Sequence, residues 1–343
     1  MATKRILLQK DIDEYLNKKL NTYGFEIPVK FSAPISLIWE ITGKCNSKCL
    51  YCSGGFPKVV KEISKQEKIN LAKEICDMKV FMISISGGEP LVNEDLLDIV
   101  SIFSDNDVPV MICTSGYNIN YEILSKLLKI KGIAFNVSID SVDAEVNDYQ
   151  RGRKGALNEA LKLIEFIREN EKERSFMSIE AVATKNNYSG MSDLVKFFNE
   201  NYSINEIRIQ PMVTMNQKVI QCGLDINAEE FQLCVTNVNG FISKYNDHVK
   251  DDNLGLSTCV RFIDQFKLIE NGLRTGRTWG GVITPDGNFL LSVYLPSNLG
   301  SIYQDGSFKT TWDNRFSCAW RNFKEDLEQK SIKNLWDLKR LYV

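Results

Sequence analysis

The sequence predicts an α/β fold: a partial (β/α)6 TIM-like barrel followed by a small C-terminal α+β extension. Between about residues 36 and 210, short apolar runs alternate with longer amphipathic stretches. This alternation is typical of parallel strands joined by right-handed helical crossovers. Six such units are too few for a closed eight-stranded barrel but suit a partial one. After residue 210 the alternation stops, which marks the extension.

Six apolar runs are expected to form the strands. They cover residues 35–42, 80–86, 108–114, 133–140, 178–184 and 206–210. Between them, stretches such as 93–103, 121–129 and 156–168 repeat apolar residues at spacings of three and four, which predicts helices. Reactive groups collect at the carboxyl ends of strands in parallel α/β folds, so we expect a functional site there.

The C-terminal third has a different pattern. Residues 227–248 are expected to form a helix, and 276–303 a hairpin that turns at Pro285-Asp286-Gly287-Asn288. The expected organisation is an N-terminal helical segment over 1–33, a core over 34–215 and a substrate-binding region over 216–343.

Composition narrows the class of protein. With 343 residues, 43% of them hydrophobic, the chain can bury a large core. It has no run of about 18 apolar residues, so we expect no membrane span, and its first 19 residues lack the apolar core of a secretory signal. A cytoplasmic protein is therefore expected. The net charge of −2, without a basic run, gives no support for binding nucleic acid.

The chain has nine cysteines and a single histidine, His248. The odd number, without a secretory signal, argues against a disulfide framework and for metal or redox chemistry. A histidine-rich metal site cannot be built from one histidine. We expect His248 itself to be a solvated residue at a helix end.

Three of the cysteines lie on one loop directly after the first strand. Cys45, Cys49 and Cys52 have a C-x3-C-x2-C spacing, which can wrap three corners of a [4Fe-4S] cubane and leave the fourth iron for a substrate or cofactor. The alternatives are a zinc site, which would need a fourth ligand nearby, or buried structural cysteines. No fourth ligand lies on this loop.

A second motif ends the second strand: Ser86, Gly87, Gly88, Glu89 and Pro90. Glycines allow a close backbone approach, and a carboxylate can accept hydrogen bonds from an ammonium group. Alone, the motif also fits an ordinary strand-to-helix turn.

Together, the cysteine loop, with Tyr51 before its last cysteine, and the Gly-Gly-Glu-Pro turn resemble the radical S-adenosylmethionine (SAM) superfamily over about residues 34–215. The resemblance implies one [4Fe-4S] cluster on Cys45, Cys49 and Cys52, whose open iron chelates SAM. One electron, from a flavodoxin- or ferredoxin-type donor, then cleaves SAM to a 5′-deoxyadenosyl radical that abstracts a substrate hydrogen.

The resemblance also implies a set of SAM contacts. Glu89, after Gly87 and Gly88, would bind the methionine ammonium, and Ser138 and Arg151 would contact the ribose and carboxylate. Arg151 could instead be an exposed loop charge. The remaining residues of the expected cofactor site are Tyr51, Ser115, Asp140, Gln210 and Met212. Ser115 stands where related enzymes often carry asparagine.

Residues 278–312 resemble the SPASM/twitch extension of radical SAM maturases. Thr278 and Ser292 stand where that extension carries two cysteines, and a hydroxyl does not replace a thiolate ligand. We therefore expect no auxiliary cluster here. Four further cysteines, Cys222, Cys234, Cys259 and Cys318, could ligate a second cluster, but their spacing follows no compact motif. Cys222 and Cys259 are candidate hydrogen-atom donors, and structural thiols are the alternative.

The expected function is modification of a ribosomally made peptide, by epimerisation or cross-linking, in natural-product biosynthesis. The roughly 44 residues before the cysteine loop are short for a leader-recognition domain, and the expected helix at 11–20 would supply only part of a docking surface. The alternative is an epimerase, dehydratase or dehydrogenase for a sugar, nucleoside or other small molecule. An iron–sulfur electron carrier would have no use for Glu89 or Arg151.

Overall fold

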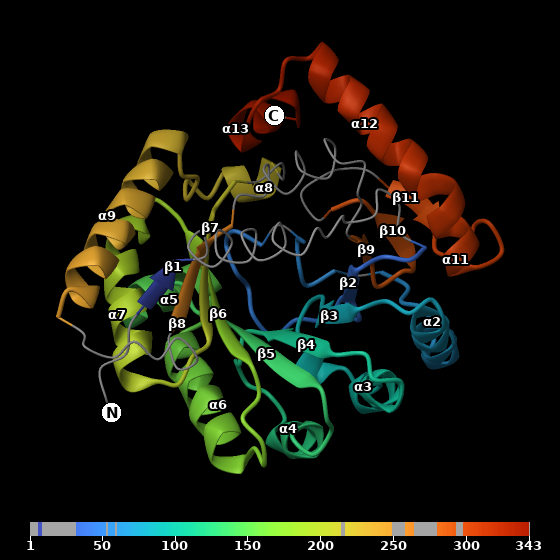
Figure 1. Ribbon diagram of the computed structural model, residues 1–343, viewed down its shortest axis with the longest axis horizontal. Helices are drawn as coiled ribbons and strands as arrows, with labels where there is room; N and C mark the ends of the chain where they lie inside the picture. The colour runs from blue at the N-terminus through green and yellow to red at the C-terminus, as the bar shows by residue number, and fades with distance from the viewer. Residues whose placement is uncertain are drawn as a thin grey trace, which may run out of the picture.

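The computed structural model describes residues 6–8, 32–52, 54–58, 60–213, 217–248, 258–263, 280–292 and 298–342. Six parallel strands form the predicted partial barrel, which does not close (Figure 1). Each lies within about four residues of its predicted ends. They are β2 (Ser36–Glu40), β3 (Met82–Ser86), β4 (Val110–Thr114), β5 (Ile133–Ser138), β6 (Met177–Ala183) and β7 (Glu206–Pro211).

The sheet is wider than the sequence predicts. Beyond β7 lie two parallel strands, β8 (Thr258–Phe262) and then β1 (Ile6–Leu8). Beyond β2 lies β9 (Gly280–Ile283), also parallel, followed by the antiparallel strands β10 (Asn288–Leu290) and β11 (Asn298–Ser301). The C-terminal strands thus extend the barrel sheet at both edges instead of forming a separate sheet.

The predicted hairpin is confirmed where the structure describes it. β9 and β10 pair antiparallel, and the Thr284 N–H donates to the Asn288 carbonyl at 2.9 Å across the turn. The residues before 280, and the helix expected over 11–20, lie outside the described residues.

The helices of the barrel alternate with its strands, as predicted. Those flanking the six central strands are α2 (Lys65–Asp77), α3 (Leu96–Asp105), α4 (Tyr121–Leu127), α5 (Ala144–Arg151), α6 (Ala156–Asn170) and α7 (Met191–Asn201). In the described part of the C-terminal region the α-helices are α8 (Gln217–Ile220), the predicted α9 (Ala228–Asn246), α11 (Phe308–Thr311), α12 (Ser317–Gln329) and α13 (Leu335–Tyr342). Capping boxes, Ser64 with Glu67 and Asn227 with Glu230, start α2 and α9.

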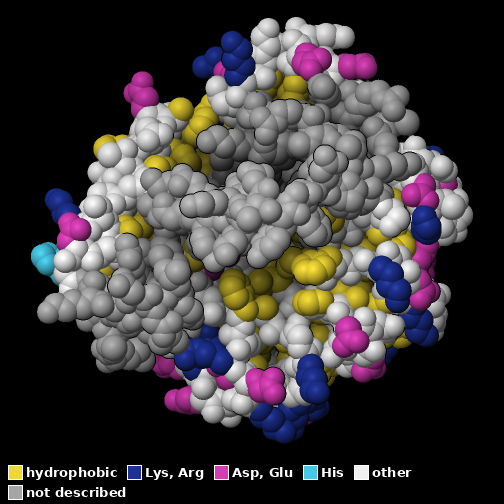
Figure 2. Space-filling view, in the orientation of Figure 1, with side chains coloured by type: hydrophobic (Ala, Val, Ile, Leu, Met, Phe, Trp, Pro, Cys, Tyr) yellow, Lys and Arg dark blue, Asp and Glu magenta, His cyan; other side chains and the backbone are white. Residues whose placement is uncertain are grey.

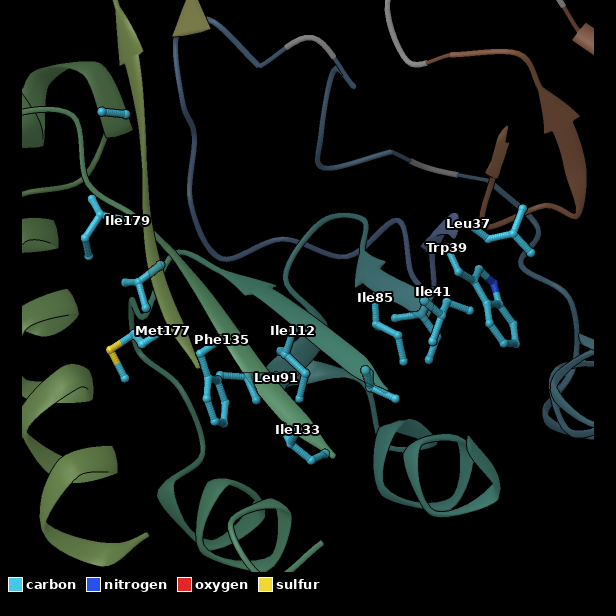
Figure 3. Packing of buried hydrophobic residues seen from close by; sticks show 14 of the residues in the cluster. Leu37, Trp39, Ile41, Ile85, Leu91, Ile112, Ile133, Phe135, Met177 and Ile179 are labelled. Carbon is cyan, nitrogen blue, oxygen red and sulfur yellow. The ribbon is translucent and has the colours of Figure 1, made fainter. Parts of the chain in front are cut away.

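The two faces of the sheet differ in polarity. On the outer face, alternate strand residues pack against the helices and form the core, as Figure 3 shows for Trp39, Ile85, Ile112 and Phe135. Successive strand residues point to opposite faces, so the residues between these core positions line the inner, concave face. Serine, asparagine, glutamate and arginine are frequent there.

On the face seen in Figure 2, basic and acidic side chains are interspersed around the described part of the rim. His248 follows α9 and is exposed, as predicted. Among the described residues, the helices are all too short or too polar to cross a membrane.

Candidate active site

The cysteine loop follows β2 at the carboxyl edge of the sheet, and its start is fixed by Glu62. This carboxylate accepts hydrogen bonds from the Thr42 hydroxyl (2.7 Å) and the Gly43 N–H (2.8 Å), and Lys68 lies 3.4 Å away. Burial alone would raise the pKa of Glu62, but these hydrogen bonds and the lysine charge hold it below its usual range. Glu62 is therefore an ionised anchor for the loop.

The middle of the loop is fixed by the end of α5. The Lys48 N–H donates to the Arg151 carbonyl at 3.3 Å, and the Leu50 N–H donates to the Gln150 carbonyl at 2.9 Å. Arg153 Nε also donates to the Asn46 carbonyl at 2.7 Å. The loop is thus held at its start by the Glu62 side chain and in its middle by the end of α5 and by Arg153.

Two glycines allow the neighbouring backbone to approach the cysteine loop closely. A Cβ on Gly88 would lie 1.8 Å from the Lys44 carbonyl oxygen, and one on Gly152 would lie 2.1 Å from that of Lys48. Gly152 also has φ +62°, a conformation that favours glycine. Any side chain at either position would push the cysteine loop away from its neighbours.

All three loop cysteines are half-buried free thiols. The Phe56 N–H donates to Cys52 Sγ at 3.3 Å, and Arg151 Nη1 lies 3.9 Å from Cys49 Sγ. Burial raises the pKa of Cys45 to about 12 and also raises that of Cys49. Without a metal these two cysteines are therefore neutral thiols, and binding iron must displace their protons.

The thiols fit an iron–sulfur cluster better than a single metal ion. In the described part of the chain, no three histidine, cysteine or acidic side chains are placed to hold one ion. A cubane puts each thiolate on a different iron, so its ligands need not converge on one point. Hydrogen bonds to the ligating sulfurs, as at Cys49 and Cys52, are typical of such clusters.

Glu89 lies at the end of β3 and is 1% exposed. One carboxylate oxygen accepts from the Thr114 hydroxyl (2.7 Å) and the Leu91 N–H (3.2 Å), and the other from the hydroxyl and N–H of Ser115, both at 2.8 Å. Burial raises the pKa of Glu89, and these hydrogen bonds oppose the rise. Since a carboxylate accepts about four hydrogen bonds, a ligand ammonium would have to share or displace one.

Asp140, just after β5, binds Arg151 in a buried ion pair. Arg151 Nη2 donates to Oδ1 at 3.0 Å and its Nε lies 2.9 Å from Oδ2. The Val182 N–H (2.9 Å) and the Tyr51 hydroxyl also donate to this carboxylate. Burial alone would lower the pKa of Arg151, but Asp140 raises it above its usual range. The alternative of an exposed loop charge for Arg151 is therefore wrong.

Tyr51 belongs to the same cluster. Its ring lies 5.4 Å from the Arg151 guanidinium carbon, and burial raises its pKa well above the usual range. Tyr51 also packs with Met212 in a small apolar cluster that includes Cys49 and Cys222 at its edge. Ser138 and Gln210 are half-buried on the inner face, near the strand ends.

The other cysteines are dispersed. Cys76 is buried in α2 and Cys234 in α9, whereas Cys113 and Cys259 are half-buried on the inner face. Ser292 follows β10, and Thr278 and the side chain of Cys318 lie outside the described residues.

Some residues that build the site carry no signal in the sequence. Glu62 is an isolated carboxylate in a polar stretch, and Asn187 donates to the Asp140 carbonyl at 2.8 Å from a loop 47 residues away. Asn147, which accepts from the Asp140 N–H at 3.0 Å, lies on a helix among other polar residues. None of the three falls in a recognisable motif.

Comparison with known proteins adds independent support. A family model, the radical SAM superfamily, matches residues 39–198. Mycofactocin maturase MftC of Mycolicibacterium smegmatis is 36% identical over 134 residues, which are 39% of this chain and 34% of MftC. The AdoMet-dependent heme synthase of Methanosarcina barkeri is 32% identical over 139 residues, 40% of each protein. The matched segment thus spans well under half of either relative.

The fold is shared with Streptococcus suis SuiB. SuiB bound to its precursor peptide SuiA gives a TM-score of 0.69 at 16% identity, covering 89% of this chain and 70% of SuiB. SuiB bound to S-adenosylmethionine gives 0.68. The chain thus shares the fold of SuiB, and the segment that matches the radical SAM family model includes the three cysteines after the first barrel strand.

Proposed function

We propose that the chain is a radical SAM enzyme in which Cys45, Cys49 and Cys52 hold one [4Fe-4S] cluster. The observation that carries this is the set of three half-buried thiols on a loop fixed by Glu62 and α5, with N–H donors beside two sulfurs. When bound, the cluster and SAM supply a 5′-deoxyadenosyl radical that abstracts a hydrogen atom from the substrate.

The chain's own residues position SAM. Glu89 offers its carboxylate to the methionine ammonium, with Gly87 and Gly88 allowing the close backbone approach. Ser138 and Gln210 are half-buried on the inner face, which suits contacts to the ribose and the adenine. Four residues complete the cofactor site mainly by holding other groups in place: Tyr51, Ser115, Asp140 and Met212.

Arg151 has a double role in this proposal. Asp140 fixes its guanidinium, and the remaining Nη1 points its charge toward Cys49 Sγ, 3.9 Å away. The same group can bind the SAM carboxylate, since a guanidinium has five N–H donors.

The substrate we propose is a ribosomally made peptide. The neighbour SuiB binds a precursor peptide. In this chain, a groove of about 490 Å³ lies beside β11, lined by Asn298, Leu299, Gly300, Asn314, Arg315, Ala319 and Asn322. β11 is the last strand of the described sheet, and an open groove beside an edge strand suits an extended peptide. A small-molecule substrate is the second candidate, favoured by the likeness to a heme synthase.

The reaction would take its electron from a flavodoxin- or ferredoxin-type protein in the cytoplasm, where thiols stay reduced. Cys259, half-buried on the inner face, and Cys222, beside the Tyr51 cluster, remain the candidates for returning a hydrogen atom to the substrate.

Cluster assembly and SAM cleavage test the central proposal. After anaerobic reconstitution and reduction, the wild-type chain is expected to convert SAM to 5′-deoxyadenosine, and Cys49→Ala to lose this activity because one iron loses its ligand. Cys76→Ala, which removes a buried thiol in α2, is the matched control and should retain it. No product from the wild type, or an undiminished yield from Cys49→Ala, would contradict the proposal.

The iron content tests whether the cluster is single. We expect about four irons per reconstituted chain, because only the loop cysteines form a cluster motif. Colorimetric iron and sulfide analysis gives the number. A value near eight would instead assign a second cluster to the C-terminal cysteines.

A further inference from the structure

The main chain of Asp140 is held from two sides by buried asparagines. The Asp140 N–H donates to Asn147 Oδ1 at 3.0 Å, and Asn187 Nδ2 donates to the Asp140 carbonyl at 2.8 Å. Asn147 lies on α5 and is 1% exposed, and Asn187 follows β6 and is 4% exposed. Both hydrogen bonds are shielded from water, where a hydrogen bond is electrostatically stronger than at the surface.

Asn187 also joins the ends of two neighbouring strands. Its Nδ2 donates to the Val182 carbonyl at 2.9 Å, and its Oδ1 accepts from the N–H (2.7 Å) and the hydroxyl (3.2 Å) of Thr184. An amide side chain has two N–H donors and two acceptor sites, so all four are used here. One side chain thus sets the distance between the end of β6 and Asp140, which comes just after the neighbouring strand β5 (Figure 1).

The Asp140 side chain is fixed as well. The Val182 N–H donates to Oδ1 at 2.9 Å, and the Tyr51 hydroxyl donates to Oδ2. The carboxylate therefore presents a fixed edge to Arg151, whose Nη2 donates to Oδ1 at 3.0 Å and whose Nε lies 2.9 Å from Oδ2. A guanidinium group is planar and rigid, so its orientation follows from that of the carboxylate.

The orientation of the guanidinium decides where its third nitrogen lies. Asp140 faces the edge formed by Nε and Nη2, and Nη1 on the opposite edge donates to Cys49 Sγ at 3.9 Å. The positive end of this buried ion pair therefore faces the sulfur. The contacts form one line from Asn187 through Asp140 and Arg151 to Cys49.

A positive charge beside a ligating sulfur favours reduction of an iron–sulfur cluster. Reduction adds one electron to the cluster, and the one-electron donor is oxidised by the same amount. Cluster potentials depend on net charge and on hydrogen bonds to the sulfurs, and charges act more strongly in a buried site than in water. Displacement of the guanidinium from Cys49 would therefore make the cluster harder to reduce.

We propose that Asn147 and Asn187 are positioning residues that raise the reduction potential of the cluster. They hold Asp140, Asp140 holds Arg151, and the guanidinium is thereby kept at hydrogen-bonding distance from Cys49 Sγ. The inference rests on the proposed function, since it needs the cluster on the three loop cysteines. The effect differs from binding SAM, because it acts on the cluster when SAM is absent.

The midpoint potential of the reconstituted full-length chain tests the proposal. It is measured without SAM, by redox titration of the electron paramagnetic resonance signal of the reduced cluster, so it does not depend on SAM binding or cleavage. We expect Asn187→Ala to lower the equilibrium constant for one-electron reduction about tenfold, which lowers the potential by about 59 mV. Asn147→Ala, which removes the other support of the Asp140 main chain, should lower it too.

A matched control removes an asparagine at the opposite edge of the sheet. Asn205 Oδ1 accepts from the Met177 N–H at 2.9 Å, at the start of β6. Asn205→Ala should therefore leave the potential unchanged. An asparagine with a merely structural role would lower the urea midpoint of unfolding without moving the potential.

A double variant shows whether Asn187 acts through Arg151. Arg151→Met removes the guanidinium and is expected to lower the potential at least as much as Asn187→Ala does. Without the guanidinium, Asn187 has no charge left to position. Asn187→Ala in the Arg151→Met background should therefore cause no further fall in the potential.

Three results would overturn the proposal. A wild-type potential in Arg151→Met, or in whichever asparagine variant folds, would show that this line of contacts does not set the potential. A further fall in the double variant would mean that Asn187 acts on the cluster by another route. A wild-type chain without a reducible cluster would overturn the inference together with the proposed function, which the first two results leave intact.

Discussion

Replacement of Asp140 by alanine is expected to lower the free energy of unfolding by about 3–5 kcal/mol, the typical cost of leaving one partner of a buried ion pair alone. The Arg151 side chain is 8% exposed and its partner carboxylate is 0% exposed. Without Asp140 the guanidinium stays buried and loses its direct ion-pair partner. The Tyr51 hydroxyl and the Val182 N–H lose their acceptor as well.

Urea denaturation followed by circular dichroism measures this loss, with Glu122→Ala as the control. Glu122 forms an ion pair with Lys126 on α4 at 2.7 Å, but the two side chains are 76% and 54% exposed. Such surface pairs contribute about 0–1 kcal/mol. If Asp140→Ala cost no more than Glu122→Ala, the buried pair would not hold this part of the site together.

A double variant separates the ion pair from packing. Arg151→Met in the Asp140→Ala background removes the unpaired charge. The double variant should therefore lose less free energy of unfolding than the two single variants lose in sum. Simple additivity would mean that the two residues act independently, against the 2.9–3.0 Å contacts between them.

The barrel strands could be predicted because their signal is local. The apolar residues that each strand packs against the outer helices recur within a short stretch, and β3, β4 and β5 each begin and end close to such a stretch. The cysteine loop and the Gly-Gly-Glu-Pro turn were likewise visible because each is contiguous in the sequence.

The outer strands and the side-chain pairs could not be predicted in this way. β1 has three residues and pairs with β8 about 250 residues later, and β9 pairs with β2 across a similar distance. The sequence suggested Tyr51, Asp140 and Arg151 as three separate SAM contacts. In the structure Tyr51 and Arg151 both bind the Asp140 carboxylate. Side chains up to 100 residues apart meet here because the parallel strands bring their carboxyl ends together.

Gly88→Ala adds a single methyl group and is expected to disrupt the iron site. The added Cβ would lie 1.8 Å from the Lys44 carbonyl oxygen and 3.1 Å from the Cys45 Cβ, and the obstacle is backbone rather than a flexible side chain. The cysteine loop must therefore move, which breaks the hydrogen bonds of the Gly88 N–H to the Thr42 carbonyl (2.8 Å) and of the Glu89 N–H to the Lys44 carbonyl (2.9 Å). Overpacking of this kind costs about 1–3 kcal/mol.

Iron content after reconstitution and urea denaturation together distinguish a displaced loop from a general loss of stability. We expect Gly88→Ala to bind clearly less iron than the wild type while its helices and sheet remain folded at low urea, since the clash is confined to the loop. Gly240→Ala is the control: a Cβ there meets nothing within 4 Å, and its position inside α9 predicts a gain of about 0.5–1 kcal/mol. A Gly88→Ala chain with full iron content would show that Cys45 can move away from β3 without loss of the site.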